Sequence, residues 1–157
     1  MEGDNRMYYL TKGNREMDPE VYLFNLPIIL TCRPTLWREK NCYGKKGNYR
    51  RFKGSIERAL NKRYELSLSD EFVEIITNEI FRRKISLVRV HVTGDFYSEE
   101  YVRKWIQIAA NCPQTRFRTT TKRRDLKDTI LELHSLSNLI LGKAWILRGP
   151  SRRWDSR

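Results

Sequence analysis

One stretch of the sequence decides the fold class, SLVRVHVTGD at residues 86–95. Every second residue of its centre is a valine, and the residues between them are polar. Side chains that alternate in this way point to opposite faces of a β-strand. Val88, Val90 and Val92 would share one face, and Arg89, His91 and Thr93 the other. We therefore predict a strand over Ser86–Gly94, with Asp95 just past its end.

Elements of alternating type surround this strand. Further strand-like runs lie at 21–31, where Pro27 predicts an edge or a bend, at 115–121 and at 138–147. Helical spacing and capping residues predict helices over 48–65, from Ser69, from Ser98 to 110, and from Asp125. Strands that alternate with helices at this spacing form parallel βα units. We expect an α/β fold, a small parallel or mixed sheet with helices packed on it.

Length and composition fit one domain. The chain has 157 residues, which is enough for a single hydrophobic core. We expect a polar N-terminal segment at 1–19, one α/β domain at 20–148 and a basic tail at 149–157. No apolar run is long enough for a membrane span, and the N-terminus lacks the pattern of a signal peptide. The expected location is the cytoplasm, that of the host cell if the protein is viral.

The charge of the chain predicts a polyanionic partner. The net charge is +12, and cations interleaved with aromatic rings are typical of nucleic-acid grooves. A first basic cluster supplies the candidate nucleic-acid-binding residues Arg33, Arg38, Lys45, Lys46, Tyr49, Arg50, Arg51 and Lys53. A second cluster supplies Arg116, Arg118, Arg123 and Arg124. The alternative is a solvated basic surface without a partner.

Polar groups at the strand ends could carry chemistry, because ligands gather at the carboxyl ends of parallel strands. Metal-assisted phosphodiester hydrolysis would use Asp95 as a ligand of Mg²⁺ or a similar divalent ion, with Glu99 or Glu100 beside it. His91 or a metal-bound water would transfer the proton, and Lys122 or Arg118 would stabilise the developing charge. The alternatives are structural: Asp95 as a turn or N-cap residue, and His91 as a hydrogen-bonded core histidine.

Two further titratable residues have mainly structural interpretations. Glu79 lies near the apolar stripe of its helix and could point toward the sheet. The favoured interpretation is a surface carboxylate that pairs with Arg82 or Arg83 at helical spacing. His134, near the end of its helix, is expected to be a partly exposed capping residue.

Several strings of the sequence resemble a known family. They include CYG at 42–44, DEFV at 70–73 and HVTGDFYS at 91–98, and together they resemble the gene product 88 family of phages, archaeal viruses and related mobile elements. The resemblance extends from about Thr31 to Arg124. It implies a compact, half-barrel-like relative of the radical S-adenosylmethionine fold, with a cysteine cluster ahead of the first helix.

The cysteines depart from that family pattern. Arg38 stands where the resemblance implies another cysteine, four residues before Cys42. Three thiolates therefore cannot come from this loop, and an iron–sulfur cluster is not expected. We expect free thiols at Cys32, Cys42 and Cys112. The alternative is a metal site that combines Cys32 and Cys42 with His91 or Cys112.

The leading hypothesis is thus a nucleic-acid-binding protein of a virus or mobile element that could act as a metal-dependent nuclease on DNA. One alternative is an iron–sulfur or S-adenosylmethionine enzyme that recruits a ligand from elsewhere in the chain. Another is a non-enzymatic viral interaction protein. The choice between DNA and RNA, and the oligomeric state, stay open at this stage.

Overall fold

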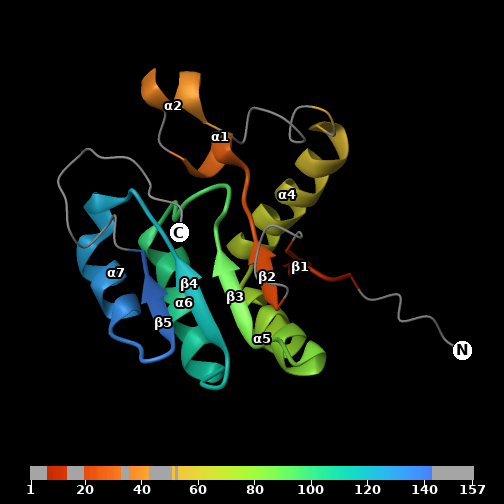
Figure 1. Cartoon of the computed structure of the whole chain (residues 1–157), viewed down its shortest axis with the longest axis vertical. Helices are drawn as coiled ribbons and strands as arrows, with labels where there is room; N and C mark the ends of the chain where they lie inside the picture. The colour runs from red at the N-terminus through yellow and green to blue at the C-terminus, as the bar shows by residue number, and fades with distance from the viewer. Residues whose placement is uncertain (1–6, 14–19, 33–35, 43–50, 52, 143–157) are drawn as a thin grey trace, which may run out of the picture.

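A five-stranded mixed sheet forms the centre of the protein. The computed structural model describes residues 7–13, 20–32, 36–42, 51 and 53–142 (Figure 1). The strands are β1 (Thr11–Lys12), β2 (Val21–Phe24), β3 (Leu87–Val90), β4 (Arg116–Thr119) and β5 (Leu139–Leu141). They lie in the order β1-β2-β3-β4-β5, with β1 antiparallel to β2 and the later neighbours parallel. The predicted α/β fold is confirmed.

Helices connect the parallel strands. They are α1 (Ile28–Thr31), α2 (Leu36–Asn41), α4 (Lys53–Leu68), α5 (Phe72–Arg83), α6 (Glu99–Asn111), the 3₁₀ turn η2 (Arg124–Leu126) and α7 (Lys127–His134). Each crossover advances in the same direction across the sheet, and right-handed crossovers of that kind place their helices on one face. In Figure 1, α6 lies behind β3 and β4. Among the described residues, no helix combines the length and apolarity that a bilayer crossing requires.

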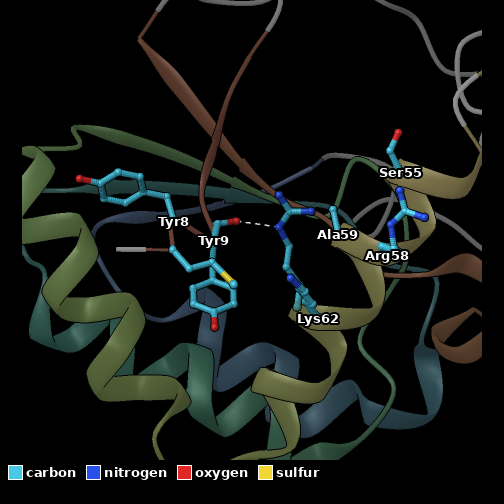
Figure 2. Close-up of a pocket in the computed structure, with 8 residues that line it drawn as sticks. Tyr8, Tyr9, Ser55, Arg58, Ala59 and Lys62 are labelled. Atoms are coloured by element: carbon cyan, nitrogen blue, oxygen red, sulfur yellow. Dashed lines mark hydrogen bonds between the residues drawn. The ribbon is translucent and has the colours of Figure 1, made fainter. Parts of the chain in front are cut away.

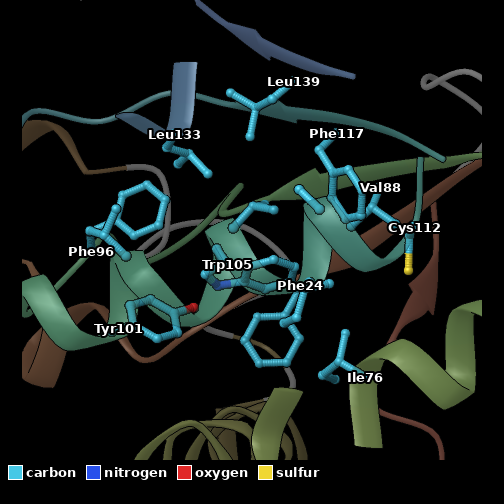
Figure 3. Packing of buried hydrophobic residues seen from close by; sticks show 14 of the residues in the cluster. Phe24, Ile76, Val88, Phe96, Tyr101, Trp105, Cys112, Phe117, Leu133 and Leu139 are labelled. Carbon is cyan, nitrogen blue, oxygen red and sulfur yellow. The ribbon is translucent and has the colours of Figure 1, made fainter. Parts of the chain in front are cut away.

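The hydrophobic core lies between the helices and the face of the sheet that they cover (Figure 3). Neighbouring strands align Val90 with Phe24 and with Thr119, and all three are buried. Trp105 of α6 is 1% exposed, and its ring centroid lies 5.4 Å from that of Phe24. α6 begins as predicted, since the Ser98 hydroxyl accepts a hydrogen bond from the Tyr101 N–H.

All four predicted strands are shorter in the structure, and β4 covers only Arg116–Thr119 of the predicted 115–121. β3 ends at Val90, because His91 has a φ of 65° and this left-handed conformation breaks the alternation of an extended chain. The prediction that Val92 continues the valine face is therefore wrong. β2 ends at Phe24, and after Pro27 the chain turns into α1 instead of continuing as a strand. The predicted end of the last strand, at 143–147, lies outside the described residues.

The helix boundaries also differ from the prediction in places. α4 is described from Lys53 and continues past residue 65 to Leu68. α5 begins at Phe72, and Ser69 does not cap it; the Ser69 hydroxyl accepts a hydrogen bond from the Glu71 N–H instead. Part of the N-terminal segment joins the fold, since β1 pairs with β2 and Leu10 is 2% exposed. Residues 7–13 are thus packed with the domain.

Candidate functional site

The second face of the sheet has no described helix over β3 and β4 (Figure 1). Pairing in register places Leu23, Arg89, Arg118 and Ile140 side by side on this face, across β2 to β5. Arg118 is exposed, and Ile140 is 53% exposed. Parallel sheets are normally covered on both faces. Since no described helix covers β3 and β4 on this side, this face is a surface where a partner could bind.

Arginines concentrate on this open face. Arg89 and Arg118 are cross-strand neighbours, about 4.8 Å apart at the backbone, and Arg116 projects from the same face two residues earlier on β4. Arg116 and Arg118 are exposed, and neither forms an ion pair with a described residue. Like charges placed next to each other on a sheet destabilise it. We call the surface formed by Arg89, Arg116 and Arg118 the arginine face. Its positive charges are suited to binding an anion.

At the carboxyl ends of the strands, Asp95 joins the loop after β3 to the end of β4. Its side chain is buried at 3% exposure. Oδ1 accepts hydrogen bonds from the Phe96 N–H at 2.8 Å and the Thr121 hydroxyl at 2.6 Å. Oδ2 accepts one from the Lys122 N–H at 3.1 Å. Asp95 therefore ties two strand ends together, which none of the sequence-based interpretations included.

The other candidate catalytic residues near Asp95 lie in different environments. Lys122 contributes its backbone N–H to Asp95 and has an exposed side chain. Glu99 is exposed on α6 and accepts a hydrogen bond from Arg103 at 2.8 Å; this bond holds the pKa of the Glu99 carboxyl below its usual range. The hydrogen bonds to the Asp95 carboxylate come from N–H and O–H donors, whereas a Mg²⁺ site needs further oxygen ligands. This donor set does not fit a metal, and the nuclease role of Asp95 stays a prediction.

Arg123 has a structural role in the same region. Its guanidinium donates to the Phe96 carbonyl at 2.9 Å and to both carboxylate oxygens of Asp125 at 2.9 and 2.7 Å. The hydrogen bonds to Asp125 raise the pKa of Arg123. A guanidinium held by a carboxylate is less available to a phosphate than one without an acidic partner. Arg124, in η2, is exposed.

His91 is a buried core histidine in the structure. It is 3% exposed, and its Nε2 lies 2.7 Å from the Tyr101 hydroxyl, with which it shares a hydrogen bond. Its ring packs against Phe96 with centroids 4.7 Å apart. Burial lowers the pKa of His91 from 6.5 to about 3. The imidazole therefore stays neutral at physiological pH and lies in the apolar core, which matches the structural alternative.

The buried imidazole predicts a dependence of stability on pH. Below pH 6.5 the unfolded chain protonates His91, whereas the folded chain does so only near pH 3, so the His91 contribution to the free energy of unfolding falls as the pH drops between these values. An NMR titration of the two histidines should show no His91 transition between pH 7 and 5. The signal that is missing from the spectrum of the His134→Gln variant is that of His134, and the remaining histidine signal is that of His91. A His91 midpoint near 6.5 would contradict the buried placement.

The first basic cluster lies mostly beyond what the structure describes. Arg33, Lys45, Lys46, Tyr49 and Arg50 fall outside the described residues, and Arg38 lies in α2 with its side chain outside them. Arg51 and Lys53 are exposed. Lys53 lies 3.9 Å from the Glu57 carboxylate, one turn along α4.

Sequence reasoning missed a buried polar cluster around Glu79. Its carboxylate accepts hydrogen bonds from the N–H groups of Tyr9 at 2.9 Å and Leu10 at 3.0 Å, and pairs with Arg83 at 2.7 Å. The predicted pairing with Arg83 is confirmed, but the predicted surface position is wrong, since Glu79 is 2% exposed. The available signal was its spacing, which places Glu79 three residues after buried Ile76 on the same helix face.

The cysteines show no disulfide among the described residues. Cys32 directly follows α1, and Cys42 comes immediately after α2; both are half-buried. Cys112 is buried at the end of α6, where burial raises the pKa of its thiol. Within the described ranges, no group of three His, Cys, Asp or Glu side chains is arranged to hold a metal ion.

Comparison with known proteins gives one match. The family model described as Gene product 88 matches residues 8–145. The match covers β1 to β5, the arginine face, and Asp95 with the residues that it bonds to. No curated protein and no solved structure matches the chain.

Proposed function

This chain belongs to the gene product 88 family, and the family name alone points to no ligand. We propose from the arginine face that the protein binds nucleic acid there, through contacts with the phosphate backbone. The observation that carries the proposal is the pair of exposed arginines on β4, beside Arg89, on a sheet face without a described helix. Arginine presents a planar fork of N–H donors that matches phosphate oxygens.

The surroundings of this face support the same ligand. Lys122 and Arg124 add exposed cations just past the end of β4, and the net charge of +12 attracts polyanions at long range. Much of the binding free energy of such contacts comes from counterions that the phosphates release. The proposed contact is therefore electrostatic and strongly dependent on salt. Hydrolysis of the bound strand stays a separate prediction, since it depends on Asp95 and a metal ion.

The test removes the two exposed arginines together, in the variant R116A/R118A. We expect its affinity for 5′-hydroxyl oligonucleotides to fall about tenfold or more, since each lost phosphate contact removes a charge-assisted hydrogen bond. The slope of log K against log salt should become shallower by about 2 for duplex DNA. Fluorescence anisotropy at two salt concentrations, with single-stranded and duplex DNA and RNA, measures both quantities.

A matched control separates the site from the net charge. The variant K12A/R82A also removes two positive charges, but these exposed residues lie on β1 and α5, outside both the arginine face and helix α4. It should retain most of the oligonucleotide affinity. Equal losses in the two variants would show that only the total charge matters, and a wild-type protein that binds no oligonucleotide would refute the proposal.

A further inference from the structure

A groove lies between residues 7–9 and helix α4 (Figure 2). Its volume is about 330 Å³, at the lower end of the range for small-molecule sites. One wall is the N-terminal segment with Met7 and Tyr9, and the other is the face of α4 that carries Arg58 and Lys62. A space of this size accepts a ligand of about one nucleotide.

The N-terminal wall of this groove is held in place by hydrogen bonds. Arg63 donates from Nε to the Tyr9 carbonyl at 2.7 Å, and buried Glu79 accepts the N–H groups of Tyr9 and Leu10. The guanidinium of Arg83 lies 4.3 Å from the ring centroid of Tyr8. The segment is thus fixed from both sides, and the groove exists before any ligand arrives.

The helix wall supplies two positive charges that no described acidic residue neutralises. Arg58 and Lys62 lie one turn apart on α4, and both are exposed. Neither forms an ion pair with a described residue, whereas Arg63 beside them is engaged with the N-terminal segment. Two adjacent cations without an acidic partner favour an anion such as a phosphate.

The opposite wall is apolar. Met7 is 55% exposed, and Tyr9 of the same segment also lines the groove, while Ala59 adds a small apolar side chain from α4. A polarisable thioether and an aromatic ring pack favourably against a flat aromatic group. The groove therefore joins an apolar surface to a pair of cations, which is the distribution that a nucleotide needs for its base and its phosphate.

We propose that this groove binds a nucleoside 5′-phosphate, either free or as the phosphorylated end of a nucleic-acid strand. The phosphate lies between Arg58 and Lys62, and the base packs against Met7 and Tyr9. The groove and the arginine face use different residues on different elements. The two proposals can therefore fail independently.

Calorimetric titration of the full chain with AMP tests the site. AMP should bind, and adenosine, which lacks the phosphate, should bind at least tenfold more weakly. R58A/K62A should lose at least tenfold in AMP affinity, while R116A/R118A should bind AMP like the wild-type protein. Both cations of the groove are exposed, so circular dichroism should show an unchanged fold for R58A/K62A. No binding of AMP, or equal binding by R58A/K62A, would overturn the proposal.

Two oligonucleotides of one sequence distinguish the sources of the phosphate. If the groove takes strand ends, the wild-type protein binds the 5′-phosphorylated form more tightly than the 5′-hydroxyl form, and R58A/K62A loses this preference. If AMP binds but the oligonucleotides show no difference, the ligand is the free nucleotide. If R116A/R118A and R58A/K62A weaken AMP binding equally, the binding is a general charge effect and the groove is not a site. If the wild-type protein binds AMP but no oligonucleotide, only the proposal that the arginine face binds nucleic acid is refuted.

Discussion

Gly94→Ala should lower the free energy of unfolding by about 4 kcal/mol. Gly94 has a φ of 85°, and a non-glycine residue held in such a conformation costs roughly 1–2 kcal/mol. An added Cβ would lie 2.7 Å from the Leu26 Cβ, 2.8 Å from the Leu26 carbonyl oxygen and 2.9 Å from the Thr31 hydroxyl. Forcing an atom into packed surroundings costs roughly a further 1–3 kcal/mol. Equilibrium denaturation in urea measures the sum.

Gly54→Ala is the matched control for this substitution. Gly54 lies inside α4, and the nearest described side chain to its added Cβ would be Arg58, at an ordinary contact distance of 3.9 Å. Alanine is favoured over glycine in a helix by about 1 kcal/mol, so this variant should gain stability. A Gly94→Ala protein within about 1 kcal/mol of wild type would show that the chain at Gly94 is not constrained as described.

Asp95→Ala should lower the free energy of unfolding by about 3 kcal/mol, because it leaves buried donors without their acceptor. The Phe96 N–H, the Lys122 N–H and the Thr121 hydroxyl all lose a carboxylate oxygen. In a chain of this length the loss corresponds to a decrease in the melting temperature of roughly 10 °C, which calorimetry detects. The control Asp70→Ala removes an exposed carboxylate and should change stability by about 0.5 kcal/mol or less.

The same variant bears on the nuclease hypothesis. Since Asp95 joins the ends of β3 and β4, its removal affects the fold as well as any chemistry. A loss of DNA cleavage in Asp95→Ala therefore indicates a catalytic role only if the variant and the wild-type protein are compared at a temperature where both are folded. An Asp95→Ala protein as stable as wild type would contradict the structural role of the tie.

The sequence by itself determined the elements whose signals are local. The valines at 88 and 90 alternate over one strand, and the Ser98 hydroxyl caps the helix that directly follows it. The helical spacing of Val102, Trp105, Ile106 and Ala109 predicts one buried stripe on α6. Val102, Trp105 and Ala109 are buried, whereas Ile106 is only partly buried against the core. Strand alternation, helix caps and helical stripes depend on neighbouring residues, so they can be read from a single sequence.

The structure alone decided where the polar side chains lie. The spacing of Glu79 from Ile76 signals the buried helix face, but its partners are backbone groups some 70 residues earlier in the chain, and no local pattern identifies those. His91 lies inside because its backbone turns left-handed at the end of β3 and its ring meets Tyr101 and Phe96. The arginine face depends on the register between β3 and β4. Local propensity fixes most of the elements that form, whereas contacts between distant segments fix which side chains meet and which share a sheet face.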